Sequence, residues 1–447
     1  MIIAWDQSIE ESKQEGLWGG GTHLFKISKV LEWLQNLAPE HDDDLVVMMD
    51  GYDIWFQLRK ELLLERYHQV NAAANKRIHD RMGRAASIEG INQTIIFGSG
   101  KRCFPNEIHT IACWPVPPSP LPKDMYGGNT DTTIGSFPKL WTSTRQKFLN
   151  SGFIMGPAKD MRALFTQASS KVTQLGDDPE PDDNGSRWSE KVYHSSDQSI
   201  FNMIFGEQEY QREILRLRHL SWVFTPLLKL KQFLGYDLSA TADTLEGNPI
   251  KSILNPPWSH ATPPTLEGAP REFHIGLDYW STLSFQTANA ESNGQWLHYN
   301  HPLSPQVQNT SRWECTPHLH PLPPDLTSSP PPFQNYPTLS SSSALESNTT
   351  PPAYASWDTI PLYTNICVGT VPAMIHLNGD KTQRESEWGK MWYQPYARTM
   401  FESLEASEQL PLVQGAGGRQ KVEPGGAFAD TGRVLGWGEL CRDWGFD

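Results

Sequence analysis

The stretch that most constrains the fold is the apolar run from Leu45 to Met49, which leads directly into Asp50-Gly51-Tyr52-Asp53. A run of this length is too short for a free-standing helix and is typical of a buried strand. Such a strand delivers two carboxylates to the open edge of a sheet, where α/β proteins bind ligands. Gly51 permits a tight turn, so Asp50 and Asp53 can both point at one hard cation that prefers oxygen ligands. The competing interpretation is that the acidic residues only form a turn or a helix cap.

Strand-like and helix-like segments alternate along the rest of the chain. We expect one or two helices over 58–84, broken near Gly83, and then a short β-rich strand at 94–97. This alternation predicts an α/β fold with a mainly parallel central sheet flanked by helices. Further segments fit it, namely helices at 26–34, 161–175 and from about 197 onward, and strands at 147–156 and 372–379.

We expect a single domain over residues 1–404. Residues 288–359 are rich in Pro, Ser, Thr and Asn and lack the apolar density to pack a core, which predicts a long disordered insertion. The strand at 372–379 cannot form a second domain by itself, which favours an insertion over an inter-domain linker. An aromatic helix at 388–404 would close the domain, and residues 405–447 would form a mostly flexible tail.

The net charge and the cysteine spacing limit the functional classes to which the protein can belong. A formal net charge of -14 and a pI near 5.5 argue against nucleic-acid binding, because phosphate backbones are held mainly by lysine and arginine. No apolar stretch is long enough to span a bilayer, and the first residues lack the basic-then-apolar pattern of a secretory signal. The five cysteines show no C-x-x-C spacing. Glycosylation sequons are compatible with a secretory lumen; they begin at Asn92, Asn184, Asn309 and Asn348.

Three further polar residues stand next to predicted strands or helices. Asp197 precedes the apolar run at 200–205, where it could cap a helix, face the sheet edge as a carboxylate, or do both. Asn150 lies where the strand at 147–156 begins and could be a turn former, and His376 could be a satisfied core histidine. Gly152 and Gly156 bracket a place where the backbone must come close to another group.

Seven segments in order resemble the glycosyltransferase domain of the multifunctional procollagen lysyl hydroxylase/glycosyltransferases and, more loosely, the procollagen galactosyltransferases. They are Gly19-Gly20-Gly21, Asp50-Gly51-Tyr52-Asp53, Ile96-Phe97 with Cys103-Phe104-Pro105, Leu149-Asn150-Ser151-Gly152, Ser196-Asp197-Gln198, Leu277-Asp278 with Phe285-Gln286, and Ile375-His376-Leu377-Asn378-Gly379. The resemblance implies a GT-A (Rossmann-like) glycosyltransferase fold that binds a UDP-sugar through a divalent cation, usually Mn²⁺.

The resemblance also implies roles for individual residues. Asp50, Asp53 and His376 match the metal ligands, a set that suits Mn²⁺. Tyr52 matches the aromatic residue against the uracil. The remaining matches are Lys26 as the lysine of the nucleotide-binding loop, Asn378 and Lys381 near the diphosphate, Asp197 as general base or orienter, and Asn150 and Gln198 as hydrogen-bond partners of sugar hydroxyls. The family's acidic residue after Phe97 is absent, because Gly98-Ser99-Gly100-Lys101 contains no carboxylate.

These features predict an enzyme, a metal-dependent glycosyltransferase that moves a hexose from a UDP-sugar to a hydroxyl acceptor on protein or glycan. One alternative is a catalytically weakened nucleotide-sugar or glycan-binding protein, because the carboxylate near Gly100 is missing. A metal-dependent phosphohydrolase also fits carboxylates at a strand end but fits the Asn150 and Gln198 segments poorly. By resemblance we expect the Golgi or ER lumen or secretion, although the lack of a targeting segment leaves a cytoplasmic location open.

Overall fold

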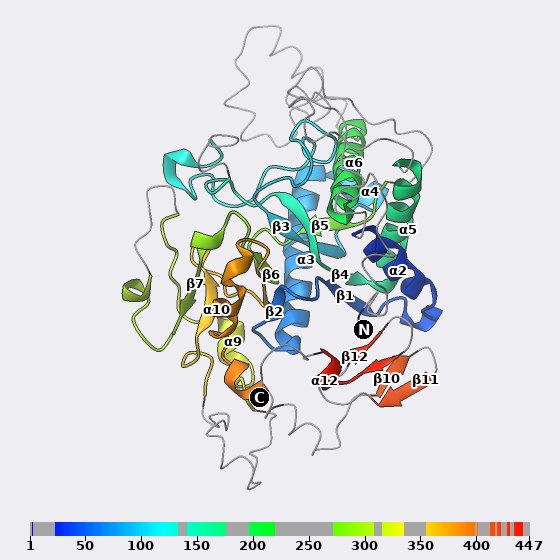
Figure 1. Cartoon of the computed structure of the whole chain (residues 1–447). Helices are drawn as coiled ribbons and strands as arrows, with labels where there is room; N and C mark the ends of the chain where they lie inside the picture. Colours follow the sequence, from blue (N-terminus) through cyan, green and yellow to red (C-terminus); the bar gives the residue numbers. More distant parts are fainter. Residues whose placement is uncertain are drawn as a thin grey trace.

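A computed structural model of the chain is shown in Figure 1. It describes residues 2, 23–132, 141–175, 196–219, 271–307, 315–334, 355–397, 400, 412–415, 418–421, 427–429 and 433–440. The helices of this part are α2 Leu24–Gln35, α3 Lys60–Met82, α4 Arg84–Glu89, α5 Ala158–Leu175, α6 Asp197–Arg218, α9 Pro324–Ser328, α10 Arg384–Trp388 and α12 Trp437–Leu440. The strands are β1 Leu45–Met49, β2 Ile54–Phe56, β3 Ile95–Gly100, β4 Phe148–Pro157, β5 Ile275–Leu277, β6 Ser284–Gln286, β7 Gly294–Leu297, β8 Leu362–Asn365, β9 Met374–His376, β10 Leu412–Gly415, β11 Gly418–Lys421, β12 Ala427–Phe428 and β13 Val434–Leu435.

The largest sheet has the strand order β1-β4-β3-β5. The fold is mixed α/β, but the expectation of a mainly parallel sheet is wrong. Strand β4 runs antiparallel to both of its neighbours, β1 and β3, and only β3 and β5 pair in parallel. The connections explain the difference: α3 and α4 link β1 and β2 to β3, whereas the described residues between β3 and β4 contain no α-helix that would carry the chain over the sheet for a parallel return.

Helices cover both faces of this sheet. Neighbouring residues of β3 point to opposite faces, so Phe97 packs with α2, α5 and α6, while Ile96 packs against α3. Figure 1 shows α2, α5 and α6 grouped on one side and α3 passing behind the strands. Strand β1 is an edge strand, and its partly buried side chains pack alternately against the two apolar cores, so Asp50 follows at the end of a strand that both layers support. The predicted helices at 26–34, 58–84 and 161–175 are confirmed, with the break at Gly83.

A smaller sheet with the order β2-β9-β6 continues from the turn after β1. Strand β9 lies in the middle, antiparallel to β2 and parallel to β6, and pairs His376 with both Ile54 and Gln286. The backbone N–H of Leu377 also donates to the carbonyl oxygen of Asp53 at 2.7 Å. This pairing brings the predicted strand at 372–379 beside the Asp50 turn, as the sequence requires for a shared site.

The predicted disorder of residues 288–359 does not hold for the part of that range that the structure describes. Strand β7 pairs antiparallel with β8, and a disulfide joins Cys315 to Cys367. Leu326 and Trp357 are buried in the same core as α3. Trp357 packs edge-on against Trp392 and donates from its indole N–H to the carbonyl oxygen of Pro330, so a few large side chains and one disulfide fasten this Pro-rich segment.

Two expectations near the C-terminus also need correction. The helical segment α10 covers only 384–388, and residues 389–396 form turns with a short 3-10 helix at Gln394–Tyr396. Of the helix expected at 388–404, Trp388 ends α10, and only Ala397 and Met400 are helical among the described residues that follow it. Pro395 at the start of that 3-10 turn interrupts a longer helix. Within the expected flexible tail at 405–447, the described residues form two antiparallel strand pairs, β10 with β11 and β12 with β13, and α12. The backbone carbonyl oxygen of buried Phe428 accepts a hydrogen bond from the N–H of Ile2.

Four cysteines are paired. A second disulfide joins Cys103 to Cys113, in the irregular segment after β3. Cys441 lies outside the described residues. None of the helices in the described part of the chain combines the length and the apolar character needed to cross a membrane.

Candidate metal centre

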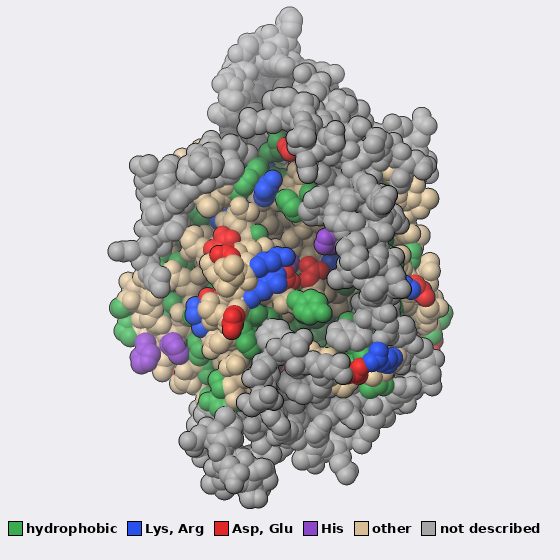
Figure 2. All heavy atoms as spheres, viewed as in Figure 1, with side chains coloured by type: hydrophobic (Ala, Val, Ile, Leu, Met, Phe, Trp, Pro, Cys, Tyr) green, Lys and Arg blue, Asp and Glu red, His purple; other side chains and the backbone are tan. Residues whose placement is uncertain are grey.

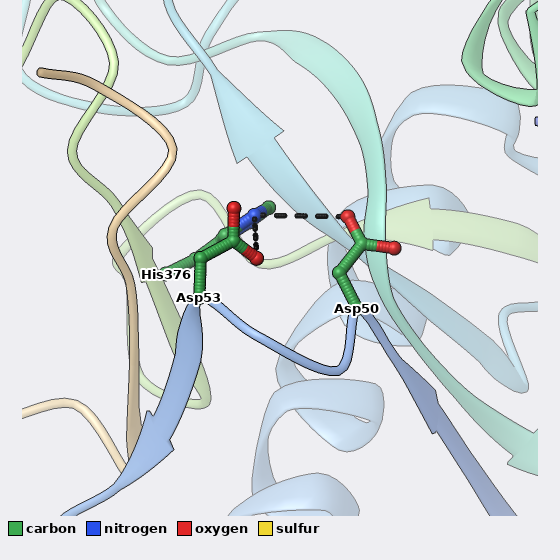
Figure 3. Close-up of side chains that lie close together, drawn as sticks. All are labelled: Asp50, Asp53 and His376. Carbon is green, nitrogen blue, oxygen red and sulfur yellow. Dashed lines mark ion pairs between the residues drawn. The ribbon is translucent and has the colours of Figure 1, made fainter. Parts of the chain in front are cut away.

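Three predicted metal ligands meet at the edge where β1 ends. Asp50 and Asp53 flank the turn between β1 and β2, and His376 reaches between them from β9 (Figure 3). His376 Nε2 lies 3.8 Å from Asp50 Oδ2 and 3.4 Å from Asp53 Oδ1. One ligand atom from each residue falls within 4.8 Å of the others, so the group could hold one metal ion. Two carboxylate oxygens and an imidazole nitrogen suit Mn²⁺ and related divalent cations.

Each of the two aspartates pairs one carboxylate oxygen with a basic side chain and turns the other oxygen toward His376. Lys26 Nζ, from α2, lies 2.8 Å from Asp50 Oδ1, and Arg384, from α10, lies 2.7 Å from Asp53 Oδ2. The oxygens left for an ion are therefore Asp50 Oδ2 and Asp53 Oδ1. Such outer contacts fix the orientation of ligands before an ion binds. Figure 2 shows basic and acidic side chains side by side near the middle of the face viewed.

A buried amide orients the histidine. His376 Nδ1 lies 2.5 Å from Gln286 Oε1, and His376 is only 2% exposed. An amide oxygen can only accept, so Nδ1 carries the proton and Nε2 is the nitrogen that faces the two aspartates. Asn378 Nδ2 donates to the same Gln286 oxygen at 3.1 Å. No sequence pattern marks Gln286 as an orienting residue, although it follows Phe285 in one of the seven resembling segments.

Two glycines give this arrangement its space. A Cβ on Gly152 would lie 2.0 Å from His376 Cε1 and 3.0 Å from Asp50 Oδ2. A Cβ on Gly98 would lie 2.6 Å from Gln286 Nε2. The close approach expected at Gly152 is thus an approach to the metal ligands themselves. Gly98 makes room for the amide that orients His376.

The local charges balance the two aspartates. Burial acts to raise the pKa of Asp53, but the hydrogen bond and charge of His376, followed by the charges of Arg384 and Lys381, hold that pKa below its usual value. Burial acts to lower the pKa of Lys26, but the carboxylates of Asp197 and Asp50 together raise it well above the ordinary lysine value. The centre therefore presents an ionised Asp53 carboxylate and a charged Lys26 at neutral pH.

The predicted base or orienter, Asp197, is not free. Asp197 is the first residue of α6 and is 6% exposed, and its Oδ2 lies 3.0 Å from Lys26 Nζ. Ser196, not Asp197, is the N-cap residue, so the helix-cap interpretation of Asp197 is not what the structure shows. Lys26 thus joins Asp50 and Asp197, two carboxylates far apart in sequence. No sequence pattern marks this lysine as a bridge.

The two predicted sugar-contacting amides bind each other. Asn150 Nδ2 donates to Gln198 Oε1 at 2.9 Å, and Asn150 Oδ1 accepts from the backbone N–H of Gly152 at 3.0 Å. Gln198 also donates to the carbonyl oxygen of Phe104. The structure therefore brings Asn150 and Gln198 together beside the metal centre, where they order the start of β4 and of α6.

The predicted nucleotide-contacting residues divide into outward-facing and inward-facing side chains. Tyr52, between the two aspartates, is 74% exposed, and Lys381 is also exposed. Asn378 is partly buried and uses both ends of its amide, on Gln286 and on the backbone N–H of Ala288. Lys26 is engaged by carboxylates, as described above. The glycine loop Gly19-Gly20-Gly21 lies outside the described residues.

Arg384 is a site residue that sequence reasoning missed. Its guanidinium joins Asp53 to α10, and its Nε donates to the carbonyl oxygen of Leu377 at 3.3 Å. The sequence offers only its position as an indication, because Arg384 follows His376 by eight residues. Comparisons with known proteins add no family: no family model matches the sequence, and no curated protein matches it.

Proposed function

We propose that this protein is a metal-dependent glycosyltransferase of the GT-A type, transferring a hexose from a UDP-sugar to a hydroxyl acceptor on protein or glycan. The observation that carries the proposal is the convergence of Asp50, Asp53 and His376 at the edge of the sheet, with exposed Tyr52 beside them. The order of the seven resembling segments along the chain supports the same reaction class.

The residues around the proposed ion have distinct tasks. When bound, Mn²⁺ supplies Lewis-acid stabilisation of the charge that grows on the departing UDP. Lys26 and Arg384 hold one oxygen of each aspartate, which keeps the other two oxygens facing His376. The exposed ring of Tyr52 is available to pack on uracil, and exposed Lys381 adds positive charge for the diphosphate.

Asp197 fits the role of a positioning residue better than that of a general base. A base must hold a free lone pair within reach of the proton it accepts. The Asp197 carboxylate is buried against Lys26, so in this arrangement it orients the lysine that holds Asp50. The acceptor would then meet its base elsewhere in the site or in solvent.

Donor binding and turnover test the proposal in one series. The wild-type protein should be stabilised against thermal unfolding by UDP only when Mn²⁺ is present, because only then do protein and diphosphate share an ion. Asp53→Ala should lose both this stabilisation and Mn²⁺-dependent release of UDP from UDP-hexoses. Asp43→Asn is the matched control, since Asp43 is an exposed carboxylate paired with Lys159 away from the centre. Full activity of Asp53→Ala would overturn the metal assignment.

One observation favours a second candidate, a nucleotide-sugar or glycan-binding protein without turnover. The buried carboxylate of Asp197 is neutralised by Lys26, and Gly98-Ser99-Gly100 supplies no other carboxylate at the neighbouring strand end. Calorimetry that shows Mn²⁺-dependent UDP-sugar binding, together with no UDP release over a broad acceptor panel, would select this candidate.

The disulfides support a secretory-pathway location. Cys103–Cys113 and Cys315–Cys367 both join cysteines that pack in the interior. Structural disulfides of this kind persist mainly in oxidising compartments. We therefore propose the ER or Golgi lumen or the extracellular space, and a thiol count on the protein isolated from its native cells would test it: free thiols at all five cysteines would argue for the cytoplasm.

A further inference from the structure

A pocket lies on the side of the β2-β9-β6 sheet opposite the candidate metal centre. Side chains alternate along β9 and the residue after it, so His376 faces the ion site while Ile375 and Leu377 face the opposite side of the β2-β9-β6 sheet, where they pack with Tyr363. On that side, a pocket of about 450 Å³ is lined by β7, β8, α10 and the segment that follows His376. This volume falls within the range of pockets that bind small molecules.

The hydroxyl of Tyr363, a buried residue, opens into this pocket without a partner in the described part of the chain. Tyr363 is 5% exposed, and its hydroxyl lies 2.1 Å from where a Cβ on Gly294 would be, so the glycine makes room for it. Among the residues that the structure describes, nothing accepts a hydrogen bond from this hydroxyl. Burial raises the pKa of Tyr363, so the hydroxyl keeps its proton. Because the hydroxyl opens into the pocket, its hydrogen-bond partner must come from a ligand or from water.

A carboxylate without a donor stands nearby. Glu291 lines the same pocket, lies against Gly379, and makes no hydrogen bond or ion pair with the described part of the chain. Its neighbour Glu387 is different, because it accepts from Trp296 Nε1 at 2.6 Å and pairs with Lys390. The pocket therefore offers one unsatisfied donor, one unsatisfied acceptor and the half-buried indole of Trp296.

This combination selects the chemistry of the ligand. Anions are disfavoured, because the lining carries three carboxylates, those of Glu291, Asp380 and Glu387, against the single lysine Lys390. An ammonium group could donate to Glu291 but has no lone pair to accept from the Tyr363 hydroxyl. A hydroxyl group does both, since it can accept from Tyr363 and donate to Glu291. A sugar ring carries several hydroxyls and also has an apolar face for the indole.

We propose that the pocket formed by Glu291, Gly294, Trp296 and Tyr363 is a saccharide-binding site, separate from the metal centre and on the other face of the β2-β9-β6 sheet. The site takes an uncharged sugar through a hydroxyl shared by Tyr363 and Glu291. It does not depend on the proposed transfer reaction, because in the described structure no hydrogen bond, ion pair or ring contact joins its four residues to Asp50, Asp53 or His376.

Ligand-observed NMR tests the site without donor or metal. The sugar probes are the methyl glycosides of glucose, galactose and mannose. The ammonium probe is Nα-acetyl-lysine methylamide, whose side-chain amine stays free and charged. At least one glycoside should give a saturation-transfer signal with the wild-type protein. Tyr363→Phe should reduce its affinity at least tenfold while leaving the melting temperature unchanged, because the lost hydroxyl has no protein partner. Tyr299→Phe, which removes a hydroxyl bonded to Thr364 outside the pocket, is the matched control and should keep the signal.

The outcomes separate this site from the proposed function. Asp53→Ala should keep glycoside binding even if it loses Mn²⁺ and UDP, which places the sugar away from the metal centre. The proposal is overturned if no glycoside binds the wild-type protein, if Tyr363→Phe binds as well as the wild type, if Asp53→Ala abolishes glycoside binding, or if the ammonium probe binds in place of the sugars. Glu291→Gln should also weaken glycoside binding, because the amide replaces one of two acceptor oxygens.

Discussion

Lys101, at the end of β3, makes stability depend on pH in a direction opposite to that of most lysines. The side chain is 1% exposed, and its ammonium donates to the carbonyl oxygen of Thr142 at 2.6 Å and lies 4.6 Å from the centre of the Tyr126 ring. Burial lowers the pKa of Lys101 to about 7, and the charge of Glu291 only partly opposes this. Folding therefore places an ammonium group where its charge is disfavoured.

The direction in which the free energy of unfolding changes with pH follows from the protons that Lys101 binds in the folded and unfolded states. A lysine in the unfolded chain titrates near a pKa of about 10.4. Between pH 7 and that value, the unfolded chain holds a proton that folded Lys101 has lost, so the free energy of unfolding rises with pH. The cost of burying the charge is present in full below pH 7 and is relieved as pH rises. The expected gain from pH 7 to pH 9 is roughly 2 kcal/mol, at about 1.4 kcal/mol per unit once the group is mostly neutral.

Lys101→Met removes the titrating group and keeps most of the side-chain volume. Urea unfolding followed by tryptophan fluorescence at pH 7, 8 and 9 gives the free energy of unfolding of both proteins. The wild type should gain roughly 2 kcal/mol relative to Lys101→Met over this interval. Lys76→Met is the control, because Lys76 is exposed and paired with Asp80, which raises its pKa. A wild-type-minus-Lys101→Met difference that stays constant with pH would refute the reasoning.

Three further predictions concern the centre and the disulfide beside the insertion. Gly152→Ala should lower the free energy of unfolding by about 1–3 kcal/mol in urea titrations, because its Cβ would meet His376 Cε1; an unchanged midpoint would contradict the close approach. Gln286→Leu should weaken Mn²⁺ binding by about 10–100-fold in calorimetry, because His376 loses its orienting partner, whereas wild-type affinity would show that Gln286 is dispensable. Replacing Cys315 and Cys367 by serine should cost roughly 4 kcal/mol in urea unfolding for a loop of 52 residues, and equal stability would argue against that disulfide.

The sequence predicted local elements well because their patterns are short-range. The apolar run before Asp50 became β1, and the periodic segments became α2, α3, α5 and α6. Strand pairing was predicted less well, because direction depends on the connection and not on the strand itself. Strand β4, which runs antiparallel to β1 and β3, follows an irregular segment, and the residues of β4 themselves do not indicate its direction.

The sequence predicts the three candidate ligands of the centre but not the residues that hold those ligands in place. Carboxylates after a strand and a histidine at another strand end are visible as motifs. Lys26, Gln286 and Arg384 are ordinary polar residues whose importance comes only from what the fold places against them. Composition was misleading for residues 288–307 and 315–334, because a polar segment needs only a few buried side chains and one disulfide to be held in place.

The position of β9 has a consequence for synthesis. It is the middle strand of its sheet, yet it is made last: 320 positions separate the start of β2 from the start of β9. At ribosomal rates of about 5–20 residues per second, β2 waits up to about a minute for β9. During that time the two aspartates lack their histidine, and β6, once made, also waits for β9. Asp50 and Asp53 are thus synthesised long before the histidine that completes the candidate site.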